Sequence, residues 1–225
     1  MKKFAIVVAG GKGLRFDAGI PKQFQLLNGK PLLMYPVEKF YAYNADLQII
    51  IVLPAEQIDY WRKLCKDYNF NVKHKIVIGG ETRFQSVKNG LSAIDEEGIV
   101  AVHDGVRPLV SIKTIEQAFK TAQLKGTAVP VIHPVDSMRE LTPFGSMPVN
   151  RNSYKFVQTP QVFKISILKE AYKQDYNPDF TDDASVVEIA GFSITLVEGN
   201  AENIKITSKS DLAIAEALVK NRNLY

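Results

Sequence analysis

Strand-like and helix-like segments alternate along the first half of this chain, and this order limits the possible folds more than any other feature. Apolar runs typical of strands occupy residues 4–9, 49–53, 75–78, 99–103 and 128–132. Helical periodicity marks the intervening segments 31–43, 56–68, 83–94 and 112–125. Strands joined through helices need right-handed crossovers, which build a mainly parallel sheet covered by helices on both faces. The 225 residues predict one α/β domain spanning 1–225.

The alternation stops at residues 134–157, a segment that we call the arm. Short extended pieces at 138–141 and 147–149 flank a Pro-Phe-Gly tip, which predicts a β-hairpin that leaves the sheet. Such a hairpin has little core of its own, so it either packs on a partner subunit or is a flexible surface insertion. Beyond the arm we expect strands at 161–163 and 193–197 and helices at 165–172, 182–190 and 210–220.

The first apolar run leads directly into the sequence GGKGLR at residues 10–15, and PKQ follows at 21–23. Glycines let successive backbone N–H groups form an anion-binding concavity, and Arg15 and Lys22 add positive charge beside it. The pattern indicates a triphosphate site, with an ordinary glycine-rich turn as the alternative. It is not a Walker loop, because no Lys-Ser or Lys-Thr follows the glycines. It also fails the dinucleotide fingerprint GxGxxG, because Phe16 replaces the last glycine.

Two further motifs follow predicted strands, so both are expected at the ligand-binding edge of the sheet. In GGETRFQS at 79–86, the backbone could bind a base while Ser86 adds a hydroxyl; the alternative is a helix cap formed by Thr82. In HDGVRP at 103–108, Asp104 could accept hydrogen bonds from substrate hydroxyls or metal-bound water, and Arg107 could hold a phosphate. The alternative is a structural Asp–Arg pair. His103 is interpreted as a packed strand residue.

A third group of loop motifs surrounds single cations with hydroxyl and amide side chains, a mixture that suits a phosphorylated polyol. These motifs are NRN at 150–152, TPQ at 159–161, TDDAS at 181–185 and NIKIT at 203–207, with Arg151 and Lys205 as the cations.

Composition narrows the possible partners. The net charge of +4 is spread along the chain without a Lys/Arg block, which favours an anionic small molecule over nucleic acid. Cys65 is the only cysteine, so we expect neither disulfides nor a zinc motif, and a reducing cytoplasm is the default location. No stretch approaches the length of a membrane span, and the apolar run after Met1 is too short for a signal peptide.

Taken together and in order, the motifs AGGKGLR, PKQ, GG, HDGVRP, TPQ, TDDAS, VEG and NIKIT resemble the 2-C-methyl-D-erythritol 4-phosphate cytidylyltransferase family of the non-mevalonate isoprenoid pathway. The resemblance covers essentially the whole chain. It implies a Rossmann-like fold, a homodimer with intertwined arms, and CTP and a polyol phosphate as substrates. It also implies a divalent cation, usually Mg²⁺, held mainly by the CTP phosphates and without an assigned protein ligand.

The resemblance also implies roles for individual residues. The catalytic set is Arg15, Lys22, Arg151 and Lys205. The CTP-binding set is Ala9, Gly10, Gly11, Gly13, Gly80, Glu81, Ser86 and Asp104. The substrate-binding set is Asp104, Arg107, Ser137, Arg151, Thr159, Thr181 and Lys205. The chain departs from the family pattern at Glu81 and Ser137, where Asp and Thr are frequent, and in HDGVR, where HDAAR is frequent.

The expected reaction is in-line attack of the substrate phosphate on the α-phosphorus of CTP, with release of pyrophosphate. Catalysis would then rest on positioning and charge neutralisation. Two alternatives stay open at this point. One is a cytidylyltransferase for ribitol 5-phosphate or ribulose 5-phosphate, although TDDAS and the VEGNAEN stretch favour the methylerythritol family. The other is a catalytically silent nucleotide-binding protein.

Overall fold

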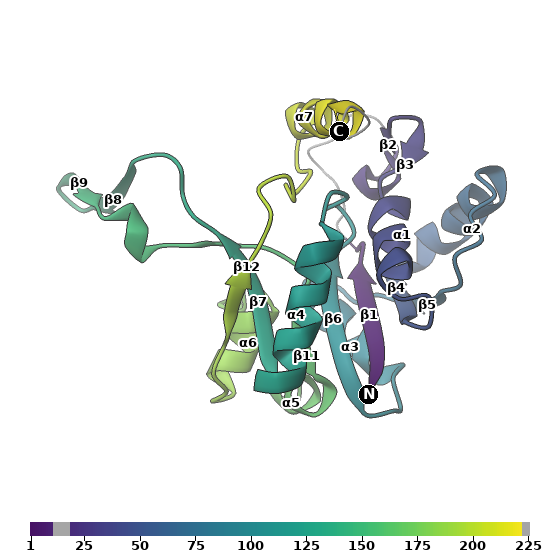
Figure 1. Cartoon of the computed structure of the whole chain (residues 1–225), viewed down its shortest axis with the longest axis horizontal. Coiled ribbons are helices and arrows are strands. Elements are labelled where there is room, and N and C mark those ends of the chain that lie inside the picture. The colour runs from purple at the N-terminus through teal and green to yellow at the C-terminus, as the bar shows by residue number, and fades with distance from the viewer. Residues whose placement is uncertain (11–18, 222–225) are drawn as a thin grey trace.

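An eight-stranded sheet forms the centre of the computed structural model, which describes residues 1–10 and 19–221 (Figure 1). The strand order is β10-β7-β11-β6-β1-β4-β5, with β12 pairing with β7. The strands are β1 (Lys2–Val8), β4 (Gln48–Leu53), β5 (Lys75–Ile78), β6 (Gly98–Asp104), β7 (Thr127–Ile132), β10 (Phe156–Val157), β11 (Gln161–Lys164) and β12 (Leu196–Glu198). The pairs β1–β4, β1–β6, β4–β5 and β12–β7 are parallel. The predicted mainly parallel α/β sheet is confirmed.

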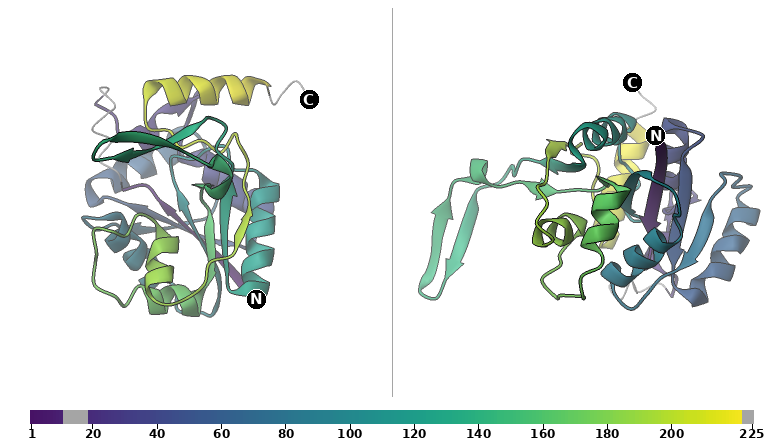
Figure 2. Two further views of the ribbon diagram at one scale, coloured as in Figure 1. Left: turned by 90° about the vertical axis from the view of Figure 1, so that its left-hand side faces the viewer. Right: turned by 90° about the horizontal axis from the view of Figure 1, so that it is seen from below.

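Helices cover both faces of this sheet (Figures 1 and 2). The central strands alternate apolar side chains between the faces: Ala5 and Val7 of β1 join one buried cluster, and Phe4 and Ile6 join the other. The first cluster contains side chains of α1 (Met34–Tyr43), α2 (Ile58–Asp67) and α4 (Ile112–Lys125). The second contains side chains of α3 (Arg83–Ser92), α5 (Ile165–Ala171) and α6 (Asp183–Ile189). Burial on both faces explains why the strands read as continuous apolar runs.

A third apolar cluster lies beyond the carboxyl end of β1, where α7 (Lys209–Asn221) lies near the small ribbon of β2 (Leu26–Leu27) and β3 (Lys30–Pro31) (Figure 1). Its buried members include Leu27, Val106, Ile206 and Ala215. Ile206 also donates its backbone N–H to the carbonyl of Val106 at 2.9 Å. This packing brings the segment before α7 to the carboxyl edge of the sheet.

The arm contains the hairpin that the sequence predicts. Its strands are β8 (Met138–Thr142) and β9 (Gly145–Val149), which pair only with each other among the described strands. Figures 1 and 2 show this hairpin extending away from the sheet. The residues Leu141 and Phe144 are 85% and 101% exposed. The hairpin is therefore confirmed, and its role in dimerisation stays a prediction.

Some boundaries differ from the sequence-based expectation. The helix predicted at 31–43 begins at Met34, because Lys30 and Pro31 pair with β2. The strand predicted at 193–197 is shorter and later, at Leu196–Glu198. The strand after the arm lies antiparallel between β6 and β7, a placement that sequence periodicity does not reveal.

Among residues 1–10 and 19–221, no helix combines the length and apolar character needed to cross a membrane.

Candidate functional site

A pocket of about 760 Å³ lies at the carboxyl edge of β1, β4, β5 and β6. The backbone continues the sheet pairing beyond these strands: Gly79 donates to Leu53 at 2.8 Å, and Gly105 donates to Val8 at 2.8 Å. Loops that follow different strands therefore meet here, as expected for an α/β sheet. The lining residues are Val8, Ala9, Gly10, Lys22, Gln23, Pro54, Ala55, Glu56, Ile78, Gly79, Gly80, Glu81, Thr82, Arg83, Ser86, Asp104, Val106 and Lys205.

Much of the predicted site comes together in this pocket. Of the residues in the CTP-binding and catalytic sets, Ala9, Gly10, Lys22, Gly80, Glu81, Ser86, Asp104 and Lys205 line it. Gly11, Gly13 and Arg15, which belong to the same sets, lie outside the described residues.

The turn at Gly79 and Gly80 is held by the helix that follows it. The Ser86 hydroxyl accepts a hydrogen bond from the Gly80 N–H at 3.1 Å and donates to the carbonyl of Thr82 at 2.9 Å. The Thr82 hydroxyl caps α3 by accepting the N–H of Gln85 at 3.0 Å. The cap and the pocket-lining turn therefore coexist, although the sequence presents them as alternatives. A Cβ on Gly80 would lie 2.1 Å from the Gln85 side chain, so this turn requires glycine in the present conformation.

Asp104 is the negative centre of the pocket, at the end of β6. Its carboxylate lies 3.0 Å from the Lys205 ammonium, 3.4 Å from Nε of Arg83 and 3.5 Å from Nε of Arg107. Burial alone would raise the pKa of the Asp104 carboxyl, but the three cations outweigh burial and hold that pKa well below its ordinary range. Asp104 is therefore an ionised carboxylate in a cationic setting.

A hydrogen-bonded chain supports Asp104 from the protein interior. The Asp104 N–H donates to the Thr159 hydroxyl at 3.1 Å, and that hydroxyl lies 3.0 Å from Nδ1 of His103. Nε2 of His103 lies 3.0 Å from the carbonyl of Arg107, so it is the protonated ring nitrogen. His103 is fully buried, and burial lowers its pKa to about 4, which keeps it neutral. It is a packed strand residue, as the sequence suggests.

Arg107 and Thr159 belong to the predicted substrate set but do not line the pocket. The Arg107 guanidinium is 12% exposed and donates from Nη1 to the carbonyl of Asn203 at 2.8 Å. Together with its ion pair to Asp104, this contact links β6 to the segment before α7. Thr159 is buried beneath Asp104. In this structure both residues support the pocket from behind.

The other predicted substrate residues lie away from the pocket lining. Thr181 is exposed, just before the residue that caps α6. Ser137 and Arg151 are exposed on the arm, where the Arg151 guanidinium donates to the carbonyl of Val135. A single subunit therefore does not bring the arm residues to the pocket.

Among the pocket residues that are absent from the predicted sets, Gln23 and Arg83 make polar contacts that shape the site. Gln23 is buried and donates from Nε2 to the carbonyl of Ala9 at 2.8 Å, which ties η1 (Lys22–Phe24) to the end of β1. Arg83 forms ion pairs with Asp104 and with Asp183 on α6. Their motifs, PKQ and GGETRFQS, were recognisable in the sequence, but the long-range partners that position them were not.

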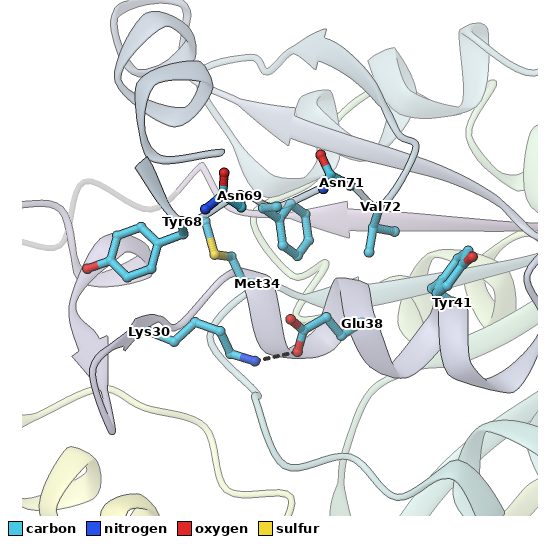
Figure 3. A pocket seen from close by; sticks show the side chains of 9 residues that line it. Lys30, Met34, Glu38, Tyr41, Tyr68, Asn69, Asn71 and Val72 are labelled. Carbon is cyan, nitrogen blue, oxygen red and sulfur yellow. Dashed lines mark hydrogen bonds and ion pairs between the residues drawn. The ribbon is translucent and has the colours of Figure 1, made fainter. Parts of the chain in front are cut away.

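A second hollow of about 250 Å³ lies between α1 and the segment 68–72 (Figure 3). An ion pair between Lys30 and Glu38 lies at its side. None of the described residues that line it belongs to a predicted set. The larger pocket is therefore the candidate active site.

The described residues contain no group of three or more His, Cys, Asp or Glu side chains placed to hold a metal ion. Asp104 is nevertheless a carboxylate in the pocket lining. Mg²⁺ sites that serve nucleotides often use one or two carboxylates together with phosphate oxygens and water. The residue set fits an ion held mainly by a nucleotide.

Comparisons with known proteins agree with this geometry. The family model for 2-C-methyl-D-erythritol 4-phosphate cytidylyltransferase matches residues 4–221. The enzyme of that name from Phocaeicola vulgatus is 54% identical over 219 residues, which cover 97% of this chain and 100% of that protein.

Solved structures of the same kind share the fold. The crystal structure of 2-C-methyl-D-erythritol 4-phosphate cytidylyltransferase from Thermus thermophilus is similar with a TM-score of 0.79 at 29% identity, covering 98% of this chain and 100% of that one. The Francisella tularensis enzyme gives a TM-score of 0.76 at 30% identity, covering 96% and 99%. From the family match and these similarities, the chain belongs to the 2-C-methyl-D-erythritol 4-phosphate cytidylyltransferase family.

Proposed function

We infer that this protein transfers the cytidylyl group of CTP to 2-C-methyl-D-erythritol 4-phosphate, giving 4-diphosphocytidyl-2-C-methyl-D-erythritol and pyrophosphate. The family membership supports the reaction. The observation that carries the assignment to a site is one pocket that joins the glycine turn at Gly80, the cation Lys22 and the Asp104–Lys205 pair. The ribitol phosphate and ribulose phosphate alternatives and the catalytically silent alternative are not favoured by the family match.

We assign the CTP half of the site to the ends of β1 and β5. Ala9, Gly10 and Gly80 line the pocket, and Ser86 holds the turn that contains Gly80. Backbone groups at such turns can bind a base or phosphates with little steric hindrance. Glu81 borders the same region. Lys22 would neutralise the triphosphate together with Gly11, Gly13 and Arg15, whose positions lie outside the described residues.

We assign the polyol phosphate half to the region around Asp104. Asp104 would accept hydrogen bonds from the polyol hydroxyls, and Lys205, which is 44% exposed, would face the attacking phosphate. Arg107 and Thr159 would support this half from behind. Thr181, and Ser137 and Arg151 of a partner subunit, would complete it.

Charge determines how such a site works. A phosphate monoester has its second pKa at about 6, so it is largely dianionic at neutral pH and needs no general base. One of its oxygens forms a bond to the α-phosphorus of CTP while the bond from that phosphorus to the pyrophosphate oxygen breaks. Lys22, Arg15, Arg151 and Lys205 would bring the two anions together and stabilise the charge of the transition state.

We propose that Mg²⁺ accompanies CTP in this pocket. The carboxylates that line the pocket are Glu56, Glu81 and Asp104; any protein ligand would come from among them, and the remaining ligands would be phosphate oxygens and water. When bound, the ion would withdraw negative charge from the triphosphate.

We propose that two copies of the chain associate through their arms. The exposed tip residues Leu141 and Phe144 lie on a hairpin that pairs with no other described strand. Large exposed apolar side chains on an extension of this kind favour a protein interface. An exchange of arms would also bring Arg151 to the pocket of the neighbouring subunit.

We further propose a single-domain enzyme that works in the cytoplasm without a nucleic-acid or membrane partner. One central sheet with helices on both faces forms the main body of the described chain outside the arm. The lone cysteine, Cys65, and the dispersed charge of +4 support the rest of this proposal.

The direct test measures pyrophosphate release from CTP with 2-C-methyl-D-erythritol 4-phosphate, ribitol 5-phosphate and ribulose 5-phosphate in parallel. We expect turnover with the methylerythritol substrate and little with the other two, and ATP, GTP and UTP serve as controls for the base. Preference for ribitol or ribulose phosphate would overturn the substrate assignment. CTP binding without pyrophosphate release from any substrate would overturn the assignment as an enzyme.

A further inference from the structure

We propose that Asp183 and Tyr172 are positioning residues for cytidylyl transfer, because together they hold the Arg83 guanidinium against Asp104. The inference rests on the proposed function and extends the site to α6 and the residue that follows α5. Neither residue lines the pocket, so both would act through Arg83.

The contacts form one continuous series. The Tyr172 hydroxyl donates to Oδ1 of Asp183 at 2.6 Å, and Nη2 of Arg83 donates to Oδ2 of the same carboxylate at 2.6 Å. On its other side Arg83 approaches Oδ1 of Asp104 through Nε at 3.4 Å. Both oxygens of Asp183 therefore have partners, which fixes the plane of its carboxylate and with it the direction of the guanidinium.

The start of α6 anchors Asp183 to the sheet. The neighbouring Asp182 caps the helix by accepting the Ser185 N–H at 2.9 Å. Gln161 of β11 donates to Oδ2 of Asp182 at 2.7 Å and accepts the Ala184 N–H at 2.8 Å. These bonds surround Asp183 with fixed backbone. The ring of Tyr172 stacks on Phe84 at 4.6 Å, so its hydroxyl is also held in place.

Two features argue for a role beyond stability. Asp183 is fully buried, and replacing a buried ion pair by apolar residues is often neutral or stabilising. Arg83 is also the first residue of α3, where a cation opposes the helix dipole. The Arg83–Asp183 ion pair therefore contributes little to stability, and Arg83 stands at an unfavourable position in its helix. Both observations are explained if the Arg83 guanidinium is needed in the pocket that it lines.

The consequence for Asp104 follows from how its two oxygens are used. Arg83 approaches Oδ1, whereas Arg107 and Lys205 approach Oδ2. If Arg83 moved, Oδ1 would lose its nearby cation and the carboxylate could rotate. A displacement of about 1 Å in a group that positions the substrate can lower the rate on the order of 100-fold.

The test compares Asp183→Asn, Tyr172→Phe, Arg83→Met and the double variant Asp183→Asn/Arg83→Met. We expect Asp183→Asn to lower kcat by about 10- to 100-fold, and Tyr172→Phe by about 10-fold, while the KM for CTP changes by less than about threefold. If Asp183 acts through Arg83, the double variant loses no more kcat than Arg83→Met alone. If the two substitutions damage the structure independently, their losses of kcat add in the double variant.

An exposed carboxylate on the same helix supplies a matched control: Glu188→Gln removes a charge from α6 outside the Tyr172–Asp183–Arg83 series and should retain kcat near wild type. Thermal unfolding checks that each variant is folded. An unchanged kcat in Asp183→Asn and Tyr172→Phe, or additive losses in the double variant, would overturn the proposal. If Asp183→Asn does not fold, Tyr172→Phe decides alone.

Failure of the function assignment gives a different pattern. Wild-type protein that turns over only another polyol phosphate overturns the substrate assignment, and the variants are then compared on that substrate. Asp183→Asn and Tyr172→Phe are still expected to lower kcat with that substrate.

Discussion

The Lys205 ammonium lies 3.0 Å from Oδ2 of Asp104, and this contact ties the segment before α7 to the end of β6. Arg107 supports the same connection from behind, through Asp104 on one side and the carbonyl of Asn203 on the other. Lys205 and the glycine turn at Gly79 and Gly80 line the same pocket. Lys205 is therefore the described cation best placed to meet an attacking phosphate near Asp104.

We expect Lys205→Met to lower kcat by about 100- to 1000-fold, the usual cost of removing one preorganised donor to a developing charge. Stability should change little, because Lys205 is 44% exposed and Asp104 keeps Arg83 and Arg107 as partners. Pyrophosphate release and thermal unfolding measure the two effects. Lys209→Met, at the start of α7, is the control and should behave like wild type. A folded Lys205→Met protein with more than half of wild-type turnover would contradict this role.

Ser86→Ala should weaken CTP binding rather than slow the chemical step. The change removes the acceptor of the Gly80 N–H and loosens the turn that borders the pocket. Loss of one such hydrogen bond costs about 0.5–1.5 kcal/mol, so we expect the KM for CTP to rise by about 2- to 10-fold with little change in kcat.

The control for this prediction is Ser92→Ala on the same helix, which removes a hydroxyl bonded to the carbonyl of Lys88. Its kinetics should match wild type. A lower kcat at unchanged KM in Ser86→Ala would instead place Ser86 in the transition state.

The architecture could be predicted from sequence because the forces that create it are local and periodic. The apolar runs and helical segments gave the sheet, both helical layers and the hairpin of the arm. The antiparallel insertion of β11 between β6 and β7 could not be predicted, because it depends on how the chain returns after the arm.

Some residues of the candidate site could be predicted from sequence motifs, and others could not. Motifs identified Ala9, Gly80, Asp104 and Lys205, which line one pocket. The contact of Arg83 with Asp183 joins two helices distant in sequence, and the burial of Thr159 beneath Asp104 follows from tertiary packing. Short motifs show which chemical groups are present, but not which of them face the ligand.

His103 should make folding stability depend on pH. Burial lowers its pKa from 6.5 to about 4, so between these values the unfolded chain binds a proton that the folded protein excludes. Stability from this group is therefore present above pH 6.5 and falls as the pH drops toward 4. The shift in the His103 pKa corresponds to about 3 kcal/mol in the free energy of unfolding.

Urea unfolding at pH 7 and pH 4.5 in wild type and His103→Gln measures this effect. The variant should lose clearly less stability than wild type on acidification, although it starts lower at pH 7 because it disturbs the contacts with Thr159 and Arg107. His133→Gln changes an exposed histidine and should keep the wild-type dependence. Equal losses in wild type and His103→Gln would contradict the prediction.

Arg151→Ala should be rescued in mixed dimers with a Lys22→Ala subunit. Lys22 lines the pocket, whereas Arg151 is exposed on the arm and does not line it. If arms are exchanged, one of the two pockets in a mixed dimer combines an intact Lys22 with an intact Arg151 from the other chain. We therefore expect about half of wild-type turnover, while each parent homodimer is strongly impaired.

Differently tagged chains that are co-expressed and purified through both tags provide the mixed dimer. Pairing Lys22→Ala with the double variant Lys22→Ala/Arg151→Ala leaves no intact pocket and should stay inactive. An inactive mixed dimer of the two single variants, or a monomeric wild-type protein, would show that the arm does not share the site between subunits.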